Sequence, residues 1–122
     1  MVIIFAAMNP LTDKMPFTDK NHLASFNPAK QHTLKSSVSI SGTGLHTGIL
    51  ADLTLKPASP GFGFQFQRID LPNQPVIKAD CDLVTDVSRG TTLEANGAKV
   101  STVEHVLAAL VGMGIDNCLL EI

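Results

Sequence analysis

The chain has 122 residues, of which 44% are hydrophobic and 16% are charged. This length allows one domain or part of a larger one, and the composition is too apolar for a chain that is disordered throughout. The formal net charge is −2, Trp and Tyr are absent, and no cluster of Lys and Arg occurs, so the composition argues against nucleic-acid binding.

Cysteine usage and the first residues bear on the compartment. The two cysteines, Cys81 and Cys118, lie far apart and outside any C-x-x-C pair. This argues against a disulfide framework or a thiolate zinc finger and favours a reducing, cytoplasmic location. The apolar segment Val2–Ala7 is too short to cross a bilayer and follows no basic region, so we expect neither a transmembrane segment nor a signal peptide.

Residues 1–30 contain Pro10, Pro16 and Pro28 and show no sustained helical or strand period. We therefore expect residues 1–30 to be a loosely ordered N-terminal extension, followed by a domain over residues 31–122.

Most of this domain is predicted to be extended. Apolar and polar residues alternate over residues 32–40, 49–58 and 61–69, as in half-buried strands, and residues 74–80 form a shorter candidate. In residues 91–101, Asn96-Gly97 separates two extended runs, which is a strong hairpin signal.

The last predicted strand covers residues 116–122 and stops with the chain. We expect it to be cut short, leaving unpaired backbone groups and exposed apolar side chains such as Leu119 and Leu120, which would favour aggregation.

One segment has a helical period. Gly112 and Gly114 provide a stop signal after it. A helix among several strands predicts an α+β fold, in which the helix covers one face of a sheet. The apolar stripe of the helix consists of Val103, Val106, Leu107, Leu110 and Val111.

The start of this helix, "STVEH", has two interpretations. Ser101 and Glu104 satisfy the S-x-x-E capping box, in which each side chain accepts a hydrogen bond from the other residue's backbone N–H. Alternatively, His105 binds a metal ion and Glu104 acts as a base on water, because adjacent helical residues point about 100° apart and cannot both chelate one ion well. A catalytic zinc needs about three protein ligands, so this pair alone is a weak signal.

A glycine-rich segment, "SGTGLHTG" over Ser41–Gly48, surrounds His46. It is either an ordinary glycine-rich turn with an exposed histidine or a place where the backbone approaches a ligand closely.

Four motifs occur in order along the chain: "SGTGLHTG", "FQRIDL" (Phe66–Leu71), "STVEHVLAAL" and "GIDNCLLEI". Together they resemble the N-terminal part of the UDP-3-O-acyl-N-acetylglucosamine deacetylase family, the zinc amidases of lipid A biosynthesis, over residues 31–122. The stretch "TDVSRGTTLEANG" further resembles the form fused to a 3-hydroxyacyl-[acyl-carrier-protein] dehydratase.

The resemblance implies two similar α+β domains, each layering helices against a sheet, with the active site between them. It implies that Glu104 is the general base acting on the zinc water, that His105 is a zinc ligand, and that His46 contacts the substrate, UDP-3-O-acyl-N-acetylglucosamine. The family's substrate-lining stretch falls on Val87–Thr92.

The family pattern is incomplete in this chain. The other two zinc ligands of the family, a His and an Asp four residues apart, belong to its carboxy-terminal domain, and no H-x-x-x-D pattern occurs in the 122 residues. We therefore expect an incomplete amino-terminal domain that is inactive as an isolated chain. The alternative from another functional class is a non-catalytic α+β binding or scaffold module that retains the fold.

Overall fold

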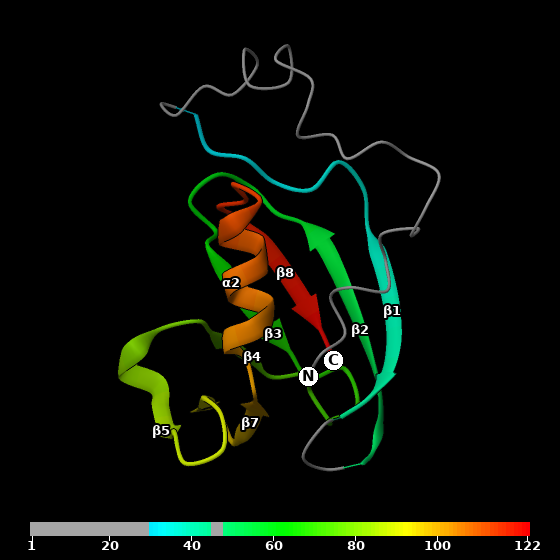
Figure 1. Cartoon of the computed structure of the whole chain (residues 1–122), viewed down its shortest axis with the longest axis vertical. Helices are drawn as coiled ribbons and strands as arrows, with labels where there is room; N and C mark the ends of the chain where they lie inside the picture. The colour runs from blue at the N-terminus through cyan, green and yellow to red at the C-terminus, as the bar shows by residue number, and fades with distance from the viewer. Residues whose placement is uncertain (1–29, 45–47) are drawn as a thin grey trace.

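In the computed structural model of the protein, residues 30–44 and 48–122 are described. They form a five-stranded sheet in the order β1-β2-β8-β3-β4 and a three-stranded sheet in the order β5-β6-β7. The elements are β1 (Val38–Thr43), β2 (Leu50–Pro57), β3 (Phe64–Gln67), β4 (Val76–Lys78), the 3-10 helix η2 (Cys81–Leu83), β5 (Val84–Asp86), β6 (Thr92–Ala95), β7 (Ala98–Ser101), α2 (Glu104–Gly112) and β8 (Cys118–Glu121). The predicted α+β class is confirmed, and Figure 1 shows α2 across one face of the larger sheet.

Alternation along the strands gives the larger sheet two different faces. Leu53, Phe66 and Leu120 are almost fully buried in the core, together with Val106 and Leu110 of α2. The opposite face carries polar pairs. Among them, Ser39 shares a hydrogen bond with Thr54, and Lys56 forms an ion pair with Glu121.

The last strand, β8, lies in the middle of the larger sheet. It pairs antiparallel with β2 and parallel with β3. The Ile122 N–H donates to the Gln67 carbonyl at 2.9 Å, and the Ile122 carbonyl accepts from the Ile69 N–H at 2.9 Å. Leu120 has no exposed surface and Leu119 is half-buried. The expectation of unpaired backbone and exposed apolar side chains in this strand is therefore wrong, because strands distant in the sequence pair with its backbone groups on both sides.

Most predicted strands are confirmed, but the first one is displaced. Residues 32–40 were predicted to be extended because Leu34, Val38 and Ile40 alternate with polar residues. The strand β1 instead begins at Val38 and continues to Thr43. Before it, Thr33 forms only an isolated bridge with Asn117.

The predicted hairpin joins β6 and β7. Ala95 is paired with Ala98, so Asn96 and Gly97 are the two residues of the turn. Their φ angles are 53° and 74°, the left-handed values that a type I′ turn requires and that Asn and Gly adopt at little cost.

The helix α2 buries Val106 and Leu110, as its apolar period predicts, whereas Val111 is 64% exposed. Its end is a Schellman motif around Gly114, whose φ is 72°. The Ile115 N–H donates to the Leu110 carbonyl at 2.9 Å, and the Gly114 N–H donates to the Val111 carbonyl at 2.9 Å. Among the described residues, no helix is long and apolar enough to cross a bilayer.

Candidate catalytic site at the start of α2

The helix begins two residues later than a capping box with Ser101 as the N-cap would require. Ser101 is the last residue of β7, Thr102 has a φ of 61°, and Val103 is the N-cap without a side-chain hydrogen bond. Ser101 is paired with Thr92, and its hydroxyl accepts from the Thr92 hydroxyl at 3.0 Å. The predicted Ser101–Glu104 capping box is therefore wrong, because pairing between β6 and β7 holds Ser101 in the sheet.

Glu104 has a different backbone partner. Its Oε2 accepts a hydrogen bond at 2.8 Å from the N–H of Thr91, which directly precedes β6. The Thr91 carbonyl in turn accepts from the Val103 N–H at 3.2 Å. Two hydrogen bonds thus join the first residues of α2 to the connection between β5 and β6.

The Glu104 carboxylate lies beside the His105 imidazole. Oε1 of Glu104 is 3.7 Å from Nε2 of His105, and the side chains are 38% and 55% exposed, respectively. Partial burial acts to raise the pKa of Glu104, but the backbone hydrogen bonds from Thr91 and Glu104 and the neighbouring His105 outweigh it. The net pKa is below the ordinary value, so Glu104 is an anion at neutral pH.

Gly90 completes the surroundings of this carboxylate. Its φ is 143°, in a region that L-residues rarely adopt. A Cβ at this position would lie 3.1 Å from Oε1 of Glu104 and 3.2 Å from Oγ1 of Thr102. The absence of a side chain therefore leaves room for the carboxylate.

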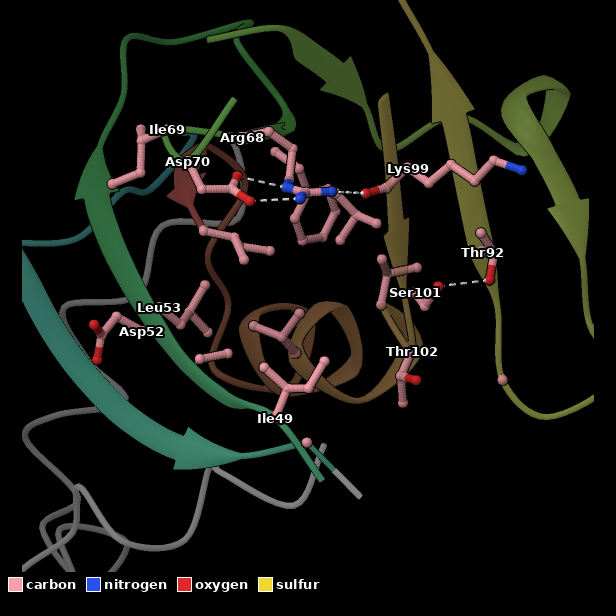
Figure 2. Close-up of a pocket in the computed structure, with 18 of the residues that line it drawn as sticks. Ile49, Asp52, Leu53, Arg68, Ile69, Asp70, Thr92, Lys99, Ser101 and Thr102 are labelled. Atoms are coloured by element: carbon pink, nitrogen blue, oxygen red, sulfur yellow. Dashed lines mark hydrogen bonds and ion pairs between the residues drawn. The ribbon is translucent and has the colours of Figure 1, made fainter. Parts of the chain in front are cut away.

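A cavity of about 790 Å³ lies next to these residues, between the two sheets (Figure 2). Gly90, Thr102 and Val103 are among its lining residues, whereas Glu104 and His105 follow directly in the chain and are not. On the opposite wall, the Arg68 guanidinium forms a bidentate ion pair with the Asp70 carboxylate, and its Nη1 donates to the Lys99 carbonyl at 2.6 Å. Figure 2 shows this guanidinium bridging the end of β3 and the strand β7.

His105 does not belong to a three-residue metal-binding group within residues 30–44 and 48–122. The group found there is Asp80, Cys81 and Asp82, all exposed. Asp80 already uses its carboxylate to accept from the Asp82 N–H at 3.1 Å. His105 is therefore an exposed imidazole beside a carboxylate, a donor that suits one position of a zinc site. Among the described residues, His32 also lies 3.7 Å from a carboxylate, that of Asp116.

The predicted site residues are placed only in part. Glu104 and His105 lie side by side, whereas His46 falls outside the described residues. Within the predicted substrate-lining stretch, Val87–Thr92, Gly90 and Thr92 line the cavity and Val87 is 72% exposed. The hydrogen bond between Thr91 and Glu104 was not predicted, since no period or motif indicates a backbone hydrogen bond across 13 residues.

Residues 31–122 match the family model of UDP-3-O-acyl N-acetylglycosamine deacetylase, LpxC. The chain belongs to this deacetylase family. It is 56% identical over 93 residues to the bifunctional enzyme LpxC/FabZ of Bacteroides thetaiotaomicron, and 46% identical over 93 residues to that of Porphyromonas gingivalis. It is also 46% identical over 93 residues to the UDP-3-O-acyl-N-acetylglucosamine deacetylase of a Psychrobacter species.

These matches cover 76% of the chain but only 20% of each bifunctional relative and 31% of the Psychrobacter deacetylase. The chain therefore spans less than a third of the length of these members of the deacetylase family. The resemblance inferred from the four motifs is confirmed, including the likeness to the bifunctional form.

Proposed function

We propose that this chain is the amino-terminal part of a zinc-dependent deacetylase that removes the N-acetyl group from UDP-3-O-acyl-N-acetylglucosamine. The observation that carries the proposal is the pairing of the Glu104 carboxylate with the His105 imidazole, 3.7 Å apart at the start of α2. The two residues that precede this pair, Thr102 and Val103, line the cavity. This pair lies in a segment that matches the deacetylase family. The proposed compartment is the cytoplasm, because Cys81 and Cys118 are free and suggest no disulfide framework.

His105 is the proposed zinc ligand. Its imidazole is 55% exposed, so an ion can reach it without rearrangement of the core. The remaining ligands would come from a carboxy-terminal domain. When bound, zinc supplies Lewis acidity that makes water easier to deprotonate and polarises a carbonyl.

Glu104 is the proposed general base. Water attacks the carbonyl carbon of the N-acetyl group, and Glu104 accepts the proton that the water loses. Cleavage of the C–N bond then releases acetate and leaves a free amine on the sugar, which takes up a proton. An anionic Glu104 is in the protonation state that this role requires. His46 is proposed to contact the substrate.

Two substitutions separate these roles in a complete deacetylase that carries this chain as its amino-terminal part. His105→Ala should reduce the zinc content, because a ligand is lost. Glu104→Gln should keep the zinc but lower kcat by at least a hundredfold, because an amide cannot accept the proton. Equal loss of zinc in both variants would refute the division into base and ligand.

The isolated chain of residues 1–122 tests the alternative of a non-catalytic module. We expect no acetate release with or without added zinc, and loss of zinc on dialysis against a mild chelator, since one imidazole holds the ion weakly. A complete protein that is also inactive and takes up no zinc would favour the binding or scaffold module.

A further inference from the structure

The two oxygens of the Glu104 carboxylate have different surroundings. Oε2 accepts the hydrogen bond from the Thr91 N–H at 2.8 Å. Oε1 lies 3.7 Å from Nε2 of His105 and 3.1 Å from the position that a Cβ of Gly90 would occupy. In the connection between β5 and β6, Thr91 thus holds one oxygen of the carboxylate, and Gly90 leaves the space beside the other oxygen free of a side chain.

We propose that Gly90 and Thr91 are positioning residues for catalysis: Thr91 fixes Oε2, and Gly90 keeps Oε1 open as the oxygen that accepts the proton. This inference rests on the proposed role of Glu104 as the base. An oxygen that already accepts a backbone hydrogen bond is the poorer proton acceptor of the two. Oε1 is also the oxygen that faces the imidazole, where the reacting water has to lie.

The geometry at Gly90 explains why this position needs a glycine. A Cβ at 3.1 Å from Oε1 is closer than nine in ten real contacts of this kind, and the same Cβ would lie 3.2 Å from Oγ1 of Thr102, so both side chains would have to give way. An alanine would therefore displace or cover Oε1. The required shift is a few tenths of an ångström. A misplacement of about 1 Å can lower a rate about a hundredfold, so we expect a smaller loss here.

Gly97 provides a matched control. Its φ of 74° is also positive, so Gly97→Ala introduces backbone strain too, although in the left-handed region and not at the 143° of Gly90. However, a Cβ at Gly97 has no heavy atom within 4 Å, so this variant leaves Glu104 untouched.

Kinetics in the complete deacetylase test the proposal. We expect Gly90→Ala to lower kcat at least tenfold, with KM and zinc content within twofold of the unmodified enzyme. Gly97→Ala should lose some thermal stability through its own backbone strain but keep kcat within twofold. Equal kcat values in the two variants, or loss of zinc from Gly90→Ala, would overturn the proposal.

A second measurement does not depend on activity. In the same protein without zinc, hydrogen exchange of the Thr91 amide should be at least tenfold faster in Glu104→Ala and unchanged in Glu104→Gln, whose amide oxygen still accepts. Glu94→Ala is the control, because Glu94 pairs with the side chain of Lys99 at 3.0 Å and not with Thr91. Unchanged exchange in Glu104→Ala would overturn the positioning role even if Gly90→Ala does not fold.

The two hypotheses fail differently. Full activity in Glu104→Gln would refute the role of Glu104 as the base and therefore the proposed function. An inactive Glu104→Gln together with a fully active Gly90→Ala would refute only the role of Gly90 and Thr91.

Discussion

Removal of the Arg68 side chain should destabilise the fold more than removal of its carboxylate partner. Nε and Nη2 of Arg68 donate to the Asp70 carboxylate at 2.8 and 2.6 Å, and Nη1 donates to the Lys99 carbonyl at 2.6 Å. The third bond joins the end of β3 to β7. Arg68 therefore links the two sheets beside the cavity, and Asp70 orients its guanidinium.

The magnitude follows from exposure. The Asp70 side chain is 53% exposed and that of Arg68 is 23% exposed. The ion pair is therefore screened by solvent and contributes about 0.5 kcal/mol. The bond to the Lys99 carbonyl is also exposed, but it is charge-assisted and contributes about 1.5 kcal/mol, the low end for hydrogen bonds of charged groups. When the packing of the aliphatic stem is included, Arg68→Ala should lower the free energy of unfolding by about 2–3 kcal/mol and Asp70→Ala by about 0.5 kcal/mol.

Urea unfolding of the two variants, monitored by circular dichroism, measures these costs. Arg89→Ala removes the same charge from an exposed position and should change the free energy of unfolding by less than about 0.5 kcal/mol. If Asp70→Ala cost as much as Arg68→Ala, the bond to the Lys99 carbonyl would contribute nothing and the linking role would be refuted.

The pH dependence has a defined sign. The hydrogen bonds from Arg68 lower the pKa of Asp70 below its ordinary value. The contribution of the pair is therefore complete above the unfolded-state pKa of about 3.9 and is lost as the pH falls through the lower folded-state pKa. The stability difference between the unmodified chain and Arg68→Ala should narrow in that acidic range.

Three further predictions concern the helix and the cysteines. Ser101→Ala should lower the free energy of unfolding by less than about 0.5 kcal/mol, whereas a capping serine would cost about 1 kcal/mol; a loss of that size in urea unfolding would restore the capping box. Gly114→Ala should lower the free energy of unfolding by about 1 kcal/mol, because φ at Gly114 is 72°. Gly112→Ala should raise it by about 0.5 kcal/mol, because Gly112 lies within α2 and an added Cβ has open space around it. Opposite shifts in melting temperature would check this contrast. A thiol reagent should modify the exposed Cys81 in the native chain and reach Cys118 only on unfolding. Cys118 is fully buried, and burial raises the pKa of its thiol. Rapid labelling of both cysteines would contradict this burial.

The local elements of this protein follow from its sequence. The period-two runs that became β2 and β3 and the Asn96-Gly97 turn depend on residues close together in the chain, so their patterns suffice to predict them. The apolar stripe of α2 and its glycine end are local signals of the same kind. The "STVEH" motif likewise identified Glu104 and His105 as neighbours, although its sequence alone left their role open.

Only the tertiary structure decided where these elements end and what surrounds the candidate site. Ser101 satisfies the spacing of a helix cap, yet pairing with Thr92 across the hairpin holds it in β7 and delays the helix to Glu104. The strand β8 pairs with β2 and β3, which lie more than fifty residues earlier in the chain. This pairing provides hydrogen-bond partners for its backbone that the sequence did not indicate. The hydrogen bond from Thr91 to Glu104 depends on the backbone, whose N–H groups are the same at every non-proline residue. A sequence pattern records side chains, so it could place the carboxylate but not the amide that holds it.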